Sequence, residues 1–475
     1  MSYIWTEQTN SGSNGWSSIA SSSNGQYLAA VVSGGYIYTS TDSGATWTPQ
    51  TSAGQHNWSS IASSSDGQYL AAVALYENIW TSTNAGVDWT EQTNSGFRSW
   101  KSIASSSNGQ KLAAVVSGRY IYTSTDSGAT WTPQTSADQH NWSSIASSSD
   151  GQYLAAVVRG GSIWTSTDSG ASWTEQTNSG SNGWSSIASS SDGQKLAAVV
   201  IEGNIWTSTN AGVDWAEHTV GGGGQYWASI ASSSDGSRLA ASVSGENNQG
   251  NIYTSTNYGA NWTEQIVGGG GQYWSSIASS SDGLKLASVV QNGNIWTGVE
   301  PPPPPCFLEG SKILTDKGYK LVQELRKGDR VKTLLHGFVP IYLIGKRDIY
   351  HGATNDRNKD QLYTCSQSKY PELFEDLVIT GAHSLLVDNF TNEEQREKTN
   401  QLLGEIYVTD NKYRVPACLD NRTTVFKTPG TYTIYHLALE HDDYYMNYGI
   451  YANGLLVETC SKRYLKELSG MEFIH

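Results

Sequence analysis

Residues 3–297 consist of one segment of about 42 residues repeated in tandem, and this periodicity restricts the possible folds more than any other feature. Each copy contains a W-x-S-I-A-S element and four short runs rich in β-branched and aromatic residues, separated by Gly, Asp, Asn and Ser turns. No run has the 3.6-residue period of a helix. Four strands in a period of this length are typical of a β-propeller blade. The tryptophans of the element lie 42, 42, 42, 42, 43 and 47 residues apart, at Trp16, Trp58, Trp100, Trp142, Trp184, Trp227 and Trp274.

The order of the strand types indicates how the repeats close. The WTEQT-like strand and the IYT- or IWT-like strand each occur seven times. Because the chain starts with the first type and the array stops after the second, the N-terminal strand can complete the last blade. Such closure removes the unpaired edges that repeated sheets otherwise expose. We therefore expect an all-β first domain over residues 1–298, a seven-bladed β-propeller closed by its N-terminal strand.

The hairpin between the third and fourth strands has its own signature, S-x-D-x-G-x-x-W, first seen from Ser40 to Trp47. A short Asp or Asn side chain binds nearby backbone N–H groups, Gly accepts a positive φ, and Trp covers the gap to the next sheet. The signature resembles the Asp-box, or BNR, repeat of sialidase-like and related propellers. We interpret its polar residues as structural. They are Asp42, Asn84, Asp126, Asp168, Asn210 and Asn257.

Charge excludes several functions for the first half. Residues 1–300 carry 20 acidic and 8 basic side chains, most of the chain's net charge of −14, which argues against binding of nucleic acids or anionic membranes. A sialidase needs several arginines around a carboxylate, whereas this half has only four in all. Sialidase activity is therefore not expected.

Differences among the repeats concentrate in turns on one face, and loops on a rigid scaffold commonly bind partners. We predict that this face binds an unknown protein or glycan, with neutral drift of solvated loops as the alternative. His56 and His140 lie two blades apart and are not expected to hold a metal. The candidate binding residues are His56, Arg98, His140, Tyr226 and Tyr273.

Five prolines, Pro301 to Pro305, separate this array from a half of different composition. All 18 tryptophans precede the prolines, and all four cysteines follow them. A proline run is a stiff extended spacer that does not enter packed helices or central strands. We expect a linker over residues 299–305 and a mostly β second domain over residues 306–475.

Motifs spread over the second half resemble, in order, the Hint fold of hedgehog autoprocessing domains and inteins. A cysteine opens the domain directly after the linker, and a T-x-x-H element follows in the middle of the domain. The matching segments are CFLEGSKIL from Cys306, VQELRKGDRV from Val322, LVITGAHSLLV from Leu377, YHLALE from Tyr435 and YANGLLVETC from Tyr451.

The resemblance implies a self-cleavage reaction at the Pro305–Cys306 bond. The Cys306 thiol would attack the carbonyl carbon of Pro305 and convert the amide into a thioester. The resemblance assigns protonation of the departing nitrogen to His383 and polarisation of the scissile peptide to Thr380. Such a protein is a single-turnover autoprotease and needs neither a cofactor nor a metal.

Departures from the family pattern limit this chemistry to one bond. Inteins usually end in His-Asn, whereas Glu458 and Thr459 stand at those positions and cannot form the succinimide in the same way. Water, a thiol or an amine would then resolve the thioester. His436 stands where many inteins have Asp or Cys. Cys460 would lie near Cys306, either able to form a disulfide with it or acting as a small buried hydrophobic residue.

The sequence is therefore compatible with two functions. The first is self-cleavage that releases or transfers a propeller binding module, and the alternative is a structural or recognition protein, such as a virion component, with an inactive Hint domain. The N-terminus has no basic or apolar signal region, and no apolar stretch is long enough to span a bilayer. We expect synthesis in the cytoplasm, with virion association or surface exposure left open.

Overall fold

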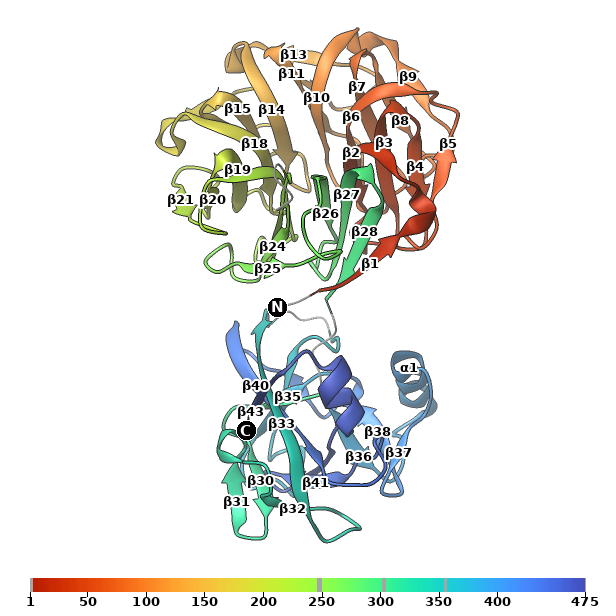
Figure 1. The fold of residues 1–475 in the computed structure, drawn as a ribbon, viewed down its shortest axis with the longest axis vertical. Helices are drawn as coiled ribbons and strands as arrows, with labels where there is room; N and C mark the ends of the chain where they lie inside the picture. The colour runs from red at the N-terminus through yellow and green to blue at the C-terminus, as the bar shows by residue number, and fades with distance from the viewer. Residues whose placement is uncertain (1–2, 246–249, 301–304, 354–356, 475) are drawn as a thin grey trace. The chain divides into compact units, whose positions relative to one another are not determined.

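A computed structural model describes residues 3–245, 250–300, 305–353 and 357–474. The chain divides into two compact units, Met1–Glu300 and Pro301–His475 (Figure 1). Most of the expected proline linker, residues 301–304, lies outside the described residues. Strands are the main secondary structure of each unit, so the predicted all-β fold class is confirmed.

The N-terminal unit is a succession of four-stranded antiparallel meanders (Figure 1). Short 3-10 turns join some of them, namely η1 (Thr9–Ser11), η2 (Thr93–Ser95), η3 (Thr135–Ala137) and η4 (Thr177–Ser179). The first four meanders are β2 (Asn14–Ser21), β3 (Leu28–Gly35), β4 (Ile37–Ser40) and β5 (Thr48–Gln50); β6 (His56–Ser63), β7 (Leu70–Glu77), β8 (Ile79–Ser82) and β9 (Thr90–Gln92); β10 (Arg98–Ser105), β11 (Leu112–Arg119), β12 (Ile121–Ser124) and β13 (Thr132–Gln134); and β14 (His140–Ser147), β15 (Leu154–Gly161), β16 (Ile163–Ser166) and β17 (Thr174–Gln176).

The last meander combines strands from both ends of the array. β1 pairs antiparallel with β28, from Ile4 opposite Val299 to Gln8 opposite Ile295. The chain therefore has no unpaired strand where the array begins and ends. The remaining meanders are β18 (Asn182–Ser189), β19 (Leu196–Gly203), β20 (Ile205–Ser208) and β21 (Ala216–His218); β22 (Gln225–Ser232), β23 (Leu239–Val243), β24 (Ile252–Ser255) and β25 (Thr263–Gln265); and β26 (Trp274–Ser279), β27 (Lys285–Gly293), β28 (Ile295–Val299) and β1 (Ile4–Gln8).

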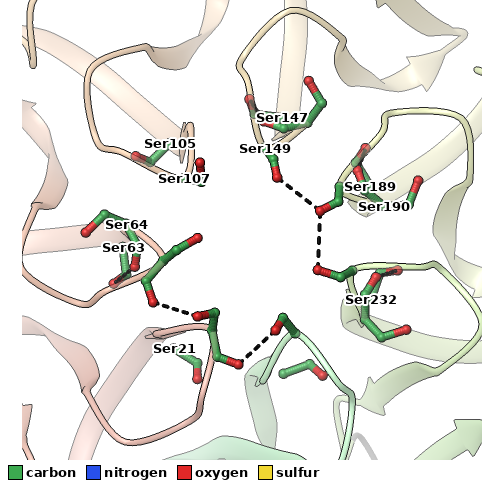
Figure 2. Close-up of a pocket in the computed structure, with 18 of the residues that line it drawn as sticks. Ser21, Ser63, Ser64, Ser105, Ser107, Ser147, Ser149, Ser189, Ser190 and Ser232 are labelled. Carbon is green, nitrogen blue, oxygen red and sulfur yellow. Dashed lines mark hydrogen bonds between the residues drawn. The ribbon is translucent and has the colours of Figure 1, made fainter. Parts of the chain in front are cut away.

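A ring of backbone hydrogen bonds joins the serine-rich turns of the meanders. The third serine of each SSS turn donates its N–H to the carbonyl oxygen of its counterpart in the next turn, at 2.7 to 2.8 Å. The series starts with Ser23 donating to Ser65 and ends with Ser281 donating back to Ser23. Serine side chains from these turns surround one opening (Figure 2). The invariance of the SSS element thus has a structural reason, since each turn binds its neighbour.

Apolar side chains are buried between consecutive meanders. One cluster joins Val31 and Ile37 of one meander to Trp58 of the next. The W-x-S-I-A-S tryptophans are at most 1% exposed. Because burial of one indole removes about 150–250 Å² from water, these residues dominate the packing of the unit.

The S-x-D-x-G turns have the local hydrogen bonds expected of them. In the first, Asp42 Oδ1 accepts from the Ser40 hydroxyl at 2.8 Å and from the Thr46 N–H at 2.8 Å. Gly44 has a φ of +91°, and a side chain there would strike Thr297 of the adjoining meander. These contacts hold the turn and fit a structural role for its aspartate.

The N-terminal unit ends two residues later than expected. The Glu300 N–H donates to the Leu284 carbonyl at 2.7 Å, and the Glu300 carboxylate pairs with Arg238. The Glu300 side chain is 5% exposed, so residue 300 belongs to the packed unit rather than to the linker.

The C-terminal unit is a 15-stranded sheet system around one core. Two long strands, β33 (Phe338–His351) and β40 (Gly430–Leu439), pair along most of their length (Figure 1). Its helices are α1 (Glu393–Leu403) and the short turns η5 (Val322–Glu324), η6 (Ala417–Leu419) and η7 (Tyr464–Leu468). Its strands are β29 (Phe307–Leu308), β30 (Lys312–Thr315), β31 (Gly318–Leu321), β32 (Arg330–Lys332), β33 (Phe338–His351), β34 (Leu362–Cys365), β35 (Leu377–Thr380), β36 (Ser384–Val387), β37 (Val408–Thr409), β38 (Lys412–Pro416), β39 (Thr424–Val425), β40 (Gly430–Leu439), β41 (Gly449–Ala452), β42 (Leu455–Glu458) and β43 (Glu472–Ile474).

Among the described residues, no helix is both long enough and apolar enough to cross a membrane.

Candidate active site

Cys306 and Thr380 are joined by two hydrogen bonds. The Cys306 N–H donates to Thr380 Oγ1 at 2.9 Å, and the Thr380 N–H donates to the Cys306 carbonyl at 3.0 Å. The pairing of β29 with β35, in which Phe307 lies opposite Ile379, sets this register. Both residues are fully buried. The nitrogen of the Pro305–Cys306 peptide is therefore held by a side chain 74 residues away in sequence.

His383 reaches the same place from the turn between β35 and β36. The His383 backbone N–H donates to the Thr380 carbonyl at 2.9 Å, which closes the T-x-x-H turn. Its ring centroid lies 4.4 Å from that of Phe307, the residue after the cysteine. The structure thus brings Cys306, Thr380 and His383 together.

Burial keeps the His383 ring neutral. Desolvation lowers its pKa to about 3, although the backbone groups of Cys306 and Glu458 partly oppose the shift. Within the described ranges, neither ring nitrogen has a partner in hydrogen-bonding geometry. A neutral imidazole has one nitrogen that accepts a proton and one that donates. His383 can therefore both take a proton from a neighbour and return one.

The Cys306 thiol is also held in its neutral form. Burial raises its pKa well above the ordinary value, the nearby Cys460 raises it further, and the charge of Arg347 partly opposes both. Because the thiolate is the nucleophile, its proton must leave as the reaction begins. The neutral His383 ring beside the cysteine has a nitrogen that can accept this proton.

His436 and Cys460 complete the buried surroundings. The His436 ring lies 5.3 Å from that of His383 and 5.8 Å from that of Phe307, and burial lowers its pKa far below the usual value. Cys460 is a free thiol whose Sγ lies 3.4 Å from the Leu437 carbonyl oxygen. All four cysteines are free in this structure, so the disulfide considered for Cys306 and Cys460 is not formed.

The match to a known family falls on this half of the chain. Residues 305–462 match the family model of the Hint domain. This match includes every residue of the site described above. The Hint fold expected from the motifs is thereby confirmed for this segment.

Solved structures resemble the N-terminal part. The structure entitled "YCF48 bound to D1 peptide" has a TM-score of 0.50 and 15% identity, and the match covers 62% of this chain and 96% of that one. YCF48 from Cyanidioschyzon merolae has a TM-score of 0.50 and 16% identity, covering 62% and 98%. At such identity the likeness shows the propeller fold alone. No curated protein matches the chain.

A cavity of about 490 Å³ in the Hint domain lies against the expected scissile bond. Pro305 lines it, together with Glu458, Thr459 and Cys460 from the end of β42 and the residues that follow. The Glu458 side chain is 6% exposed, and its Oε2 lies 3.0 Å from Arg414 Nε. The Glu458–Thr459 pair, which marks the departure from inteins, is thus part of the wall of this cavity.

Sequence reasoning missed three residues of the site. Phe307 packs on both buried histidines, Arg347 acts on the Cys306 thiol, and burial together with Cys306 raises the pKa of Tyr464. Arg347 and Tyr464 come from β33 and η7, which carry no motif pointing to the cysteine. Only Phe307 had a usable signal, its position next to Cys306.

Three candidate binding residues of the propeller occupy equivalent positions. His56 Nε2 lies 2.8 Å from the Ala53 carbonyl oxygen, and Arg98 Nη1 donates to the Ser95 carbonyl at 2.8 Å. The His56 and His140 rings each pack on two tryptophans, whereas Arg98 lies 4.6 Å above the Tyr122 ring. These side chains cover the tryptophan layer, and at least two of them also bind the backbone of the preceding turn.

The two tyrosine candidates lie in the later repeats. Tyr226 is opposite Ile201 in the pairing of β22 with β19, and its carbonyl accepts from the Ser244 N–H at 2.7 Å. Tyr273 is 42% exposed. Its side chain is the most accessible of the five candidates for a partner.

Proposed function

We propose that the Hint domain cleaves the chain at Pro305–Cys306 through a thioester and thereby releases or transfers the propeller. The observation that carries this proposal is the double hydrogen bond between Cys306 and Thr380, with the neutral His383 ring beside them. This arrangement fixes the scissile nitrogen where a proton donor can reach it.

The first step moves an acyl group from nitrogen to sulfur. The neutral His383 takes the Cys306 thiol proton, and the sulfur attacks the Pro305 carbonyl carbon. The C–N bond then breaks, and the imidazolium returns the proton to the Cys306 nitrogen. Low pKa values of buried histidines favour this return, because the charged ring is unstable in that environment. The product is a thioester of Pro305 and a free amino group on Cys306.

We propose that the N-terminal unit acts as a seven-bladed Asp-box propeller that binds a protein or glycan on its variable-loop face. One propeller of similar fold has been solved with a peptide bound. The exposed Tyr273 ring supports a binding role for this face. Cleavage after Pro305 would release this unit whole, because the compact unit comprises Met1–Glu300.

Intact-mass spectrometry of the full chain, with and without dithiothreitol, tests the cleavage. We expect a fragment that ends at Pro305, at a rate raised by the thiol. Cys306→Ala should abolish this fragment, whereas Cys365→Ala, a matched change at another buried cysteine, should not. A chain that stays at 475 residues under all these conditions would instead favour a structural or recognition protein, such as a virion component, with an inactive Hint domain.

A further inference from the structure

Glu458 is a buried carboxylate, and one of its oxygens accepts no hydrogen bond from the residues that the structure describes. This oxygen is Oε2, for which none of these residues has a donor in hydrogen-bonding geometry. Arg414 Nε lies 3.0 Å away, but its N–H is directed to Thr409 Oγ1 at 2.7 Å. Arg414 therefore offsets the charge of Glu458 without saturating its lone pairs.

The electrostatic environment makes this carboxylate a stronger base than an ordinary glutamate. Burial raises the pKa of Glu458, and Arg414 and hydrogen bonds from Ser384 only partly oppose that effect. A carboxylate whose pKa is raised takes a proton from a weak acid such as water more readily than an ordinary glutamate does.

The position of Glu458 links it to the thioester. Glu458 lines the same cavity as Pro305, whose carbonyl carbon is the acyl carbon. The backbone of Glu458 lies beside the His383 ring, and its side chain acts on the neighbouring Cys460 thiol. The cavity is large enough to hold several water molecules, each of which needs about 10–15 Å³ of such space.

The other charges of the cavity disfavour a cationic acceptor. Lys359, Arg414 and Arg463 line it, against the single carboxylate of Glu458. This excess of positive charge disfavours an ammonium ion next to the acyl carbon. A neutral water molecule avoids this repulsion but needs a base, because its own proton is held far too tightly at neutral pH.

We infer that Glu458 is the general base of the second step and that the cavity holds the water that hydrolyses the thioester. This inference rests on the proposed thioester chemistry and assigns its acceptor. It gives the position at which inteins usually have the histidine of the His-Asn ending a different task in this chain.

Hydrolysis of the thioester transfers one water proton to the Cys306 sulfur by way of Glu458. Water oxygen bonds to the Pro305 carbonyl carbon while the Glu458 carboxylate takes one water proton. The C–S bond breaks, and the sulfur leaves as the Cys306 thiolate. Glu458 then returns the proton to that thiolate. The products are the Pro305 carboxylic acid, which ionises in solution, and the Cys306 thiol.

Glu458→Gln in the full chain tests the inference, because it removes the base while keeping the size of the side chain. Release of the Pro305 fragment is followed by intact mass at neutral pH, in buffer alone and in dithiothreitol. Dithiothreitol attacks as a thiolate and needs no base. We expect hydrolytic release to slow by about 100-fold or more, the range of general base catalysis. Dithiothreitol-induced release should stay within about threefold of the rate of the unmodified chain, because attack by a thiolate does not require Glu458 as a base.

Dithiothreitol-induced release also reports folding and the first step. Glu375→Gln, a matched change at a glutamate paired with Lys312 outside the cavity lining, should leave both rates unchanged. Hydrolysis at the normal rate in Glu458→Gln would overturn the inference. Loss of both releases would also overturn it, by placing Glu458 in the first step or in folding. If the unmodified chain yields no fragment with any nucleophile, the proposed function itself is wrong, and this inference falls with it.

Discussion

The hydrogen bond from the Cys306 N–H to Thr380 Oγ1 allows us to predict how much Thr380→Val slows cleavage. Valine has nearly the shape of threonine but lacks the oxygen that accepts this bond at 2.9 Å. Both residues are fully buried, so no water replaces the lost partner. An unsatisfied buried donor costs about 1–3 kcal/mol.

If this free energy is what holds the scissile peptide against the cysteine, its loss appears in the barrier of the first step. At about 1.4 kcal/mol per factor of ten, cleavage should slow by about 5- to 150-fold. The assay is single-turnover release of the Pro305 fragment in saturating dithiothreitol, followed by intact mass. Thr380→Ser keeps the hydroxyl and should cleave within about threefold of the unmodified rate, a change of less than 1 kcal/mol. Thr380→Val cleaving as fast as the unmodified chain would refute the role assigned to this bond.

Three further predictions concern pH and stability. Because the pKa of His383 is about 3 and that of Cys306 is raised, the reactive pair of neutral ring and thiol persists across the neutral range. Cleavage should therefore not fall as pH drops from 7.5 to 5, as an ordinary histidine base would require, when dithiothreitol is raised at each pH until release no longer depends on its concentration. As pH falls, His383 takes up a proton near pH 6.5 in the unfolded chain but only near pH 3 in the folded chain. The free energy of unfolding should therefore fall between about pH 6.5 and 3, by up to about 1.4 kcal/mol per pH unit for this residue. Urea unfolding at pH 7 and pH 5 should show a smaller pH effect in His383→Gln than in the unmodified chain. Glu300→Gln leaves the Arg238 charge buried without its carboxylate partner and should destabilise the propeller by about 3–5 kcal/mol, seen as a lower Tm. Glu175→Gln, at an exposed site, should leave the Tm unchanged. Equal Tm values for Glu300→Gln and the unmodified chain would show that Glu300 is not part of the packed unit.

Local chemistry explains why much of the propeller was predictable from the sequence. Each strand and turn depends on residues within one repeat, and the same sequence pattern recurs from repeat to repeat. The S-x-D-x-G turn, for example, is held by Asp42 and its own neighbours, Ser40 and Thr46. The pairing of β1 with β28 follows from counting strand types. The boundary at Glu300 did not follow, since it depends on Arg238, 62 residues earlier.

The variable loops show the opposite case. His56 and Arg98 differ in chemistry and were predicted to bind a partner because they differ. In the structure both side chains reach the backbone of the preceding turn and lie over the tryptophan layer. Sequence variation at such a position says little about function when several side chains can make the same contact.

The sequence alone determined the repeat, the turn chemistry, the division at the prolines and the order of Cys306, Thr380 and His383, because each of these is a local pattern. Only the tertiary structure decided the protonation states of the site and the place of Glu458. Desolvation depends on everything packed around a group, and here the surrounding residues come from separate strands such as β29, β33, β40 and β42. For the same reason, only the fold shows that Glu458 shares a cavity with Pro305, more than 150 residues earlier in the chain.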